Sequence, residues 1–150
     1  MMKKLLYTND QPVGLILRLT LGIVLLPHGL QQLLGCFGGN GFSGTMQYYT
    51  GMVHLPWLIA LLVILVLSFG SLFLILGFAG RLMAALQLIF LLGATFTAHL
   101  PFGFFMNWYG TQKGEGFEFH LLGIGVALAL MITGSGRFSI DRLITSKQAA

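Results

Sequence analysis

The stretch PWLIALLVILVLSFGSLFLILGFAGRLMAAL, from Pro56 to Leu86, decides the fold of this chain. It opens with an apolar run over residues 56–78, which is long enough to cross a bilayer, since a membrane helix needs roughly 20 apolar residues. A second apolar run, over residues 81–101, follows after only Ala79 and Gly80. Because this connection is so short, we expect the two helices to pack antiparallel as a hairpin.

Two further apolar stretches, over residues 12–34 and 117–134, flank the hairpin. Only 8% of the 150 residues are charged, whereas soluble domains carry about 25% charged residues. The sequence therefore predicts an all-α fold in which residues 1–150 form a single domain. That domain is an integral membrane four-helix bundle with the lipid bilayer as its surroundings.

The positions of the basic residues predict the orientation of the bundle. Lysine and arginine near the ends of spans are retained on the cytoplasmic side. With the N-terminus inside, only Lys113 falls on the outer side, and the inner side holds Lys3, Lys4, Arg81, Arg137, Arg142 and Lys147. This asymmetry predicts an N-in/C-in protein.

Composition and motifs exclude several classes of protein. The net charge of +4 is scattered through apolar sequence and forms no basic patch, so no nucleic-acid partner is expected. The single cysteine, Cys36, excludes a disulfide framework and multi-cysteine metal sites. No HExxH, CxxC, nucleophile elbow or phosphate loop occurs, which leaves hydrolases and kinases without support.

Two long connections, rich in glycine and aromatic residues, are predicted on the outer side. They cover residues 35–54 and 102–119, and we expect both to fold against the bundle or the membrane interface. The inner connections are minimal. Because loops on a rigid scaffold commonly carry function, a site is expected at the outer end.

Polar side chains converge at that outer end. The predicted topology brings all four histidines, His28, His54, His99 and His120, to one level, with Glu118 beside the last. Ionisable groups at membrane depth are costly and usually functional, so His28, His99 and Glu118 are the candidate catalytic residues. The alternative is that each histidine is simply hydrated or bonded to a neighbouring carbonyl.

Gln31 and Gln32 follow His28 at i+3 and i+4 and therefore share its helix face. We assign them to ligand binding, together with His120, Phe104, Phe105 and Trp108. Histidine and carboxylate also suit transition metals, but their spacing matches no recognised site, so no metal-binding residues are assigned and the sequence leaves open whether a haem or metal is bound.

Arg18 lies inside the first apolar stretch, with Gly14 and Gly22 on the same face. Small residues allow close helix approach, and the guanidinium is expected to hold backbone carbonyls or a lipid headgroup. We favour this structural role over contact with a substrate.

Five segments of the chain resemble, in order, the motifs of the DoxX family of small four-helix membrane proteins. They are RLTLGIVLLPHGLQQLLGCFGGNGFSGT from residue 18, LGFAGRLMAAL from 76, AHLPFGFF from 98, GEGFEFHLLGIG from 114 and GSGRFSIDRL from 134. The resemblance covers nearly all of residues 18–143. The resemblance implies that the residues at the matching positions are important for the family. They are Arg18, His28, Gly29, Gln31, Arg81, His99, Gly103, Phe104, Phe105, Glu118, Ser139 and Asp141, of which Arg81 and Asp141 are taken as structural.

The resemblance implies a multi-pass protein of a bacterial inner membrane or an archaeal membrane. Members are described as subunits of a terminal quinol oxidase or of thiosulfate:quinone oxidoreductase, and others as partners of oxidative-stress enzymes. Relatives often carry a lysine where this chain has Gln32, and a glutamate in the second span, where it has Leu67 and Ser68.

The sequence is compatible with three functions. The first is a membrane component of a quinone-linked redox system, which binds a quinone or similar apolar ligand in an outer pocket and works with a protein partner or as a homo-oligomer. The second is a non-enzymatic scaffold or assembly factor for a redox or oxidative-stress enzyme. The third, a permease, is disfavoured because few polar groups are visible along the second to fourth spans.

Overall fold

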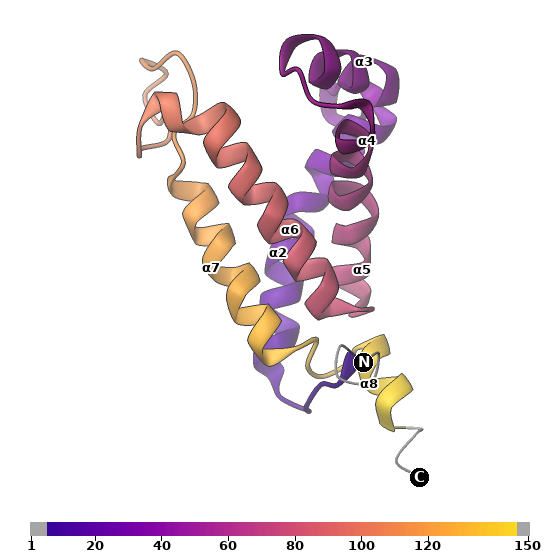
Figure 1. Ribbon diagram of the computed structural model, residues 1–150. Coiled ribbons are helices and arrows are strands. Elements are labelled where there is room, and N and C mark those ends of the chain that lie inside the picture. The colour runs from indigo at the N-terminus through magenta and orange to yellow at the C-terminus, as the bar shows by residue number, and fades with distance from the viewer. Residues whose placement is uncertain (1–5, 147–150) are drawn as a thin grey trace.

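The computed structural model describes residues 6–146, which contain helices and no strand (Figure 1). Three of the lysines that predict the orientation, Lys3, Lys4 and Lys147, lie outside the described residues. The elements are α2 (Pro12–Leu34), η1 (Cys36–Gly38), α3 (Gly41–Gln47), η2 (Tyr48–Met52), α4 (Trp57–Leu65), η3 (Val66–Gly70), α5 (Ser71–Leu76), α6 (Gly80–Ala94), η4 (Thr95–His99), η5 (Leu100–Phe102), α7 (Glu118–Thr133) and α8 (Ile140–Ser146).

Three of the described helical segments are long and apolar enough to cross a membrane: Pro12–Leu34, Trp57–Leu76 and Gly80–Phe102. The membrane class and the all-helical fold are therefore confirmed. α7 is apolar but has 16 residues, which span about 24 Å at 1.5 Å per residue, less than a hydrocarbon core of about 30 Å. The fourth span and the N-in/C-in orientation stay predictions.

The bundle has two dissimilar ends (Figure 1). The terminal end holds the start of α2, the turn between α5 and α6, and α8. The loop end holds the two long connections, residues 35–56 and 103–117. In Figure 1 α6 and α5 lie close together toward the terminal end, and the α6–α7 pair diverges from α4 toward the loop end.

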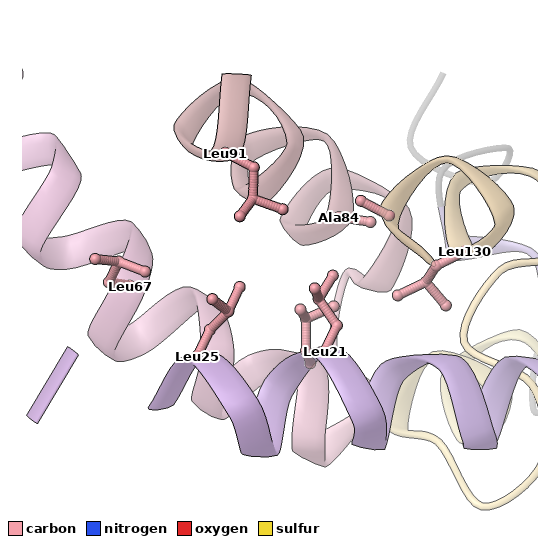
Figure 2. Close-up of a cluster of buried hydrophobic side chains, with 8 residues drawn as sticks. Leu21, Leu25, Leu67, Ala84, Leu91 and Leu130 are labelled. Atoms are coloured by element: carbon pink, nitrogen blue, oxygen red, sulfur yellow. The ribbon is translucent and has the colours of Figure 1, made fainter. Parts of the chain in front are cut away.

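Leucine and alanine side chains from four helical segments fill the middle of the bundle. Figure 2 shows Leu21 and Leu25 of α2 on one side of this core and Ala84, Leu91 and Leu130 on the other, with Leu67 beside Leu25. All of these side chains are buried. Since lipid is as apolar as leucine, close packing and paired polar groups hold such helices together.

Glycines bring α2 unusually close to the α4–η3–α5 rod. A Cβ on Gly29 would lie 2.5 Å from the carbonyl carbon of Leu67 and 2.6 Å from Cα of Ser68. The Ser68 hydroxyl donates to the Gly29 carbonyl at 3.0 Å. Only a residue without a side chain allows this contact, which lies one residue from His28.

The π-helical turn η3 frees a backbone carbonyl in the middle of the bundle. Nε2 of Gln87, on α6, donates to the Val66 carbonyl at 2.9 Å and to the Ser71 hydroxyl at 3.0 Å. Gln87 and Ser71 are fully buried. A polar group within the apolar core thus joins α6 to η3 and α5.

Arg18 holds the terminal end together. Its guanidinium is 2% exposed and donates five hydrogen bonds, to the carbonyls of Leu74, Ile75, Ser135, Arg137 and Phe138. Two of these carbonyls end α5, where the last turn has no intrahelical donors and a positive charge is favourable. Arg18 therefore caps α5 and ties it to the segment that follows α7.

Asp141 makes the matching contact at the start of α6. Its carboxylate accepts from the backbone amides of Ala79 and Gly80 at 2.7 and 2.9 Å and from the Ser135 hydroxyl. These amides begin a helix, where a negative charge is stabilising. Ala79 has φ of +50°, which is costly for a residue with a Cβ, and Asp141 fixes that turn.

Arg81 is bound less completely than Arg18. Its Nη1 donates to the Met131 carbonyl at 2.9 Å, joining α6 to the end of α7. Its Nε is buried without a partner among the described residues.

Candidate functional site

The first long connection folds back over the end of α2. Gly35 takes the left-handed conformation at φ +76° and ends the helix, and α3 then packs against α2 and α4. A Cβ on Gly39 would lie 2.4 Å from the Gln31 carbonyl oxygen. Glycine at these two positions thus lets the connection lie directly on the helix.

A cavity of about 300 Å³ lies beneath this folded connection. It is lined by Gln31, Gln32, Gly39, Asn40, Thr45, Tyr48 and Tyr49. The lining has three side-chain amides, a buried threonine and two tyrosines, and no charged side chain. Small-molecule sites typically have volumes of about 300–1,000 Å³, so this one is large enough for a single ring and little more.

Gln32 and Tyr49 are the half-buried neighbours of Thr45, the buried residue of the lining. The carbonyl oxygen Oε1 of Gln32 is buried and has no hydrogen-bond partner in residues 6–146. Burial raises the pKa of the Tyr49 phenol to about 12, although the adjacent Gln32 amide acts in the opposite direction. The phenol therefore stays neutral, and the cavity offers hydrogen bonds without charge.

His99 and His120 form a second polar group at the loop end. Their ring centroids are 4.0 Å apart and the rings are tilted by 38°. Nδ1 of His99 lies 2.9 Å from the Glu115 carbonyl oxygen, so in the neutral ring this nitrogen carries the proton and Nε2 keeps its lone pair. His120 is buried, and its Nδ1 has no partner in the described chain.

The other two histidines differ in their surroundings. His28, on α2, is within electrostatic reach of His120 and one helical turn from Gln32. His54 lies in the connection before α4, is exposed, and has φ of +59°. The structure thus associates three of the four predicted histidines and leaves His54 outside the group.

Glu118 holds the second long connection in place. Its Oε1 accepts from the Trp108 indole nitrogen at 2.8 Å and from the Met106 amide at 3.1 Å. Glu115 accepts from the Asn107 amide in the same way. These contacts occupy the carboxylate that the sequence assigns to catalysis and give Glu118 a positioning role for the loop.

The predicted aromatic residues pack with one another in this connection. Phe104 makes edge contacts with Phe105 and Phe117, with centroids 5.2 and 5.4 Å away. Phe105 is 65% and Trp108 is 76% exposed. They form the surface of the loop, and none of them lines the cavity.

The site predicted as one pocket is therefore two groups. Gln31 and Gln32 line the cavity, whereas His99 and His120 contact each other between η4 and α7 and His28 lies one turn from Gln32. Sequence reasoning missed Asn40, Thr45, Tyr48 and Tyr49, which no motif marks, and it missed Gln87, a lone polar residue in an apolar run. Residues 6–146 contain no group of three or more histidine, cysteine, aspartate or glutamate side chains placed to hold a metal.

Together these features define an all-helical, multi-pass membrane protein with a small neutral cavity at one end. The sequence profile of the DoxX family matches residues 13–100. This chain belongs to the DoxX family, which confirms the resemblance seen in its motifs.

Two known proteins are similar over most of the chain. The "Inner membrane protein YqjF" of Escherichia coli (strain K12) is 33% identical over 147 residues, which cover 97% of this chain and 99% of that protein. The "Putative oxidoreductase CatD" of Bacillus subtilis (strain 168) is 28% identical over 130 residues, or 87% and 85% of the two chains. No solved structure matches the chain significantly.

Proposed function

We propose that this protein is the membrane component of a quinone-linked redox system, located in a bacterial inner membrane, and that it binds the ring of a quinone in the cavity under the first connection. The observation that carries the proposal is the neutral cavity of about 300 Å³ lined by Gln31, Gln32, Tyr48 and Tyr49. The names of the two relatives, an inner membrane protein and an oxidoreductase, agree with it.

The chemistry of the lining suits a quinone ring. The ring is neutral and planar, so it suffers no charge penalty in an uncharged cavity. Its two oxygen atoms can bond to side-chain amides and phenols, and its faces can lie against tyrosine. The cavity has no room for an isoprenoid tail, which would remain in the surrounding lipid.

The histidines supply groups that can take up a proton near the ring. His28 is one turn from Gln32 and within electrostatic reach of His120, and a neutral imidazole accepts a proton on its unprotonated ring nitrogen. His99 keeps a lone pair on Nε2 because its Nδ1 faces the Glu115 carbonyl. The electrons would pass to a partner protein or to a cofactor, which supplies the redox chemistry.

Binding of a short-tailed quinone to the purified protein in lipid nanodiscs tests the proposal. Thr45 is buried in the cavity lining, so Thr45→Leu should fill the cavity and weaken binding at least about tenfold, equivalent to 1.4 kcal/mol. Ser43→Leu is the matched control, because Ser43 is exposed on the same short helix. Absence of binding by the wild type, or equal affinity in Thr45→Leu, would refute the proposal.

A scaffold function is the second candidate, and the second connection favours it. This loop is fixed internally by Glu118 and Glu115, yet it exposes Trp108 at 76% and Tyr109 at 91%. A rigid loop that presents aromatic residues suits a protein partner. Co-purification lost in Trp108→Ala but kept in Thr45→Leu would support the scaffold over quinone binding.

A further inference from the structure

Two arginine side chains meet at the surface of the terminal end. Nε of Arg137 and Nη1 of Arg142 lie 3.2 and 2.6 Å from the same oxygen atom, Oδ1 of Asp10. Each of the three side chains is between 38% and 49% exposed. Because one negative charge holds two positive ones together, this cluster keeps an excess of positive charge at the surface.

An exposed aromatic ring adjoins the two arginines. Phe138 is 79% exposed, and the Arg137 guanidinium carbon lies 6.0 Å from the centre of its ring. Its φ of +55° is a left-handed conformation, which is costly for a residue with a Cβ. Apart from the arginine, the folded chain gives this ring little to pack against, which points to a partner outside the chain.

Buried contacts fix the backbone that carries the ring and the first arginine. Arg18 donates to the carbonyls of Arg137 and Phe138 at 3.3 and 2.8 Å. The Arg137 amide donates to the Gln11 carbonyl at 3.2 Å. The arrangement of charge and ring is therefore built into the folded chain.

The cluster lies where the spans meet the membrane boundary. Asp10 closely precedes the span Pro12–Leu34, and Arg18 ties the arginine segment to the carbonyls that end the span Trp57–Leu76. The ends of spans lie at the headgroup layer, where anionic lipids attract basic side chains. A guanidinium pairs well with phosphate oxygens, and an aromatic ring at this depth can lie against the acyl chains.

We propose that Arg137, Arg142 and Phe138 form a binding site for an anionic phospholipid, with the two guanidinium groups on the headgroup phosphate and the ring against the acyl chains. The excess positive charge favours a headgroup with a net negative charge. A free anion would leave the exposed ring uncovered, so the occupant is a lipid. The site lies at the end of the bundle opposite the cavity, and it does not depend on the proposed function.

Fluorescence quenching by brominated lipids tests the proposal. A single-tryptophan reporter protein, made by Trp57→Phe, Trp108→Phe and Phe138→Trp, is placed in phosphatidylcholine nanodiscs. These contain increasing fractions of chain-brominated phosphatidylglycerol or, in parallel samples, of chain-brominated phosphatidylcholine. The fraction that gives half of the quenching should be at least about fivefold lower for the anionic lipid, the effect of one arginine near an anionic headgroup.

Three variants of the reporter show whether the arginines cause this preference. Arg137→Gln combined with Arg142→Gln should abolish it, and the exposed positions of both side chains should leave the melting temperature nearly unchanged. Asp10→Asn should strengthen it, because the anion that competes with the headgroup is removed. The matched control carries Ile89→Trp in place of Phe138→Trp; Ile89 is 66% exposed in α6 and should show no preference.

Four outcomes would overturn the proposal. They are equal quenching of the reporter by the two lipids, a preference that survives the double glutamine variant, a weaker preference in Asp10→Asn, and an equal preference in the Ile89→Trp control. Quenching by acrylamide in water with none by either lipid would overturn it too, and would leave this surface for a protein partner. The comparison of the two lipids in the reporter needs no arginine variant.

Discussion

The two ends of the bundle use buried polar groups in opposite ways. At the terminal end, Arg18 donates five hydrogen bonds and Asp141 accepts three through its carboxylate. At the loop end, Gln32 Oε1 and His120 Nδ1 are buried without partners in residues 6–146, whereas at the terminal end this holds for Arg81 Nε alone. The first arrangement stabilises the fold, and the second leaves buried polar atoms unpaired.

This difference has an energetic basis. A satisfied buried network makes its members interdependent, so that the loss of one leaves several others unpaired. An unpaired group already costs free energy, and its removal relieves that cost. Substitutions at the terminal end should therefore reduce stability, whereas substitutions at the loop end should change binding and leave stability nearly unaffected.

The largest effect is expected for Arg18→Met. It leaves buried carbonyls of α5 and of the segment after α7 without a donor, and the loss of a buried charged partner typically costs about 3–5 kcal/mol. Thermal unfolding of the detergent-purified protein measures it. The control, Arg142→Ala, breaks an exposed pair with Asp10 and should cost about 0–1 kcal/mol. Equal melting temperatures for the two variants would remove the distinction between the ends.

Gly29→Ala should give the next largest effect. The new methyl group would meet backbone atoms of Leu67 and Ser68 at 2.5–2.6 Å, so α2 and η3 have to separate, at a cost of about 1–3 kcal/mol. Gly125→Ala is the control, because no atom lies within 4 Å of its Cβ; it should stabilise α7 by about 0.5–1 kcal/mol. The difference in melting temperature between Gly29→Ala and Gly125→Ala measures this cost. Equal melting temperatures would show that α2 and η3 are not closely packed at Gly29.

His120→Phe should leave stability unchanged or raise it by up to about 1 kcal/mol, because an unpaired buried nitrogen is removed while the contact with the His99 ring is kept. Its melting temperature compared with the wild type is the measurement. A decrease in melting temperature as large as that of Arg18→Met would mean that His120 belongs to a structural network, as Arg18 and Asp141 do.

The smallest effect should be confined to alkaline pH. The folded state raises the pKa of Tyr49 to about 12, so it favours the neutral phenol, while in the unfolded chain the phenol ionises near its ordinary pKa of about 10. This contribution to stability is complete below pH 10 and is lost as the pH rises from about 10 to about 12.

Absorbance at 295 nm follows this ionisation directly. Of the four tyrosines, one should titrate near pH 12 in the wild type, and this late step should be absent from Tyr49→Phe. Titration of all four near pH 10 would show that the cavity lining is open to water, and would weaken the contrast between the two ends.

The sequence predicted the helices well and the site only in part. The predicted spans 12–34, 56–78 and 81–101 correspond to Pro12–Leu34, Trp57–Leu76 and Gly80–Phe102. The positions of Gln31, Gln32, His99 and His120 at one end followed from the same topology. Tyr48 and Tyr49 could not be found, because they reach the cavity only when the first connection folds back over α2. The contact of Glu118 with Trp108 likewise depends on how the second connection is folded.

The sequence by itself determined that this protein is helical, that it enters a membrane and approximately which residues form each long apolar helix. It does so because a helix in lipid satisfies its own backbone hydrogen bonds, so apolar length alone defines it. Only the tertiary structure decided which polar groups are paired: Arg18 with carbonyls from two distant segments, Asp141 with the start of α6, and the carbonyl oxygen of Gln32 with no donor in residues 6–146. Hydrogen bonds between helices depend on distances of a few tenths of an ångström, and those are set by how the helices pack.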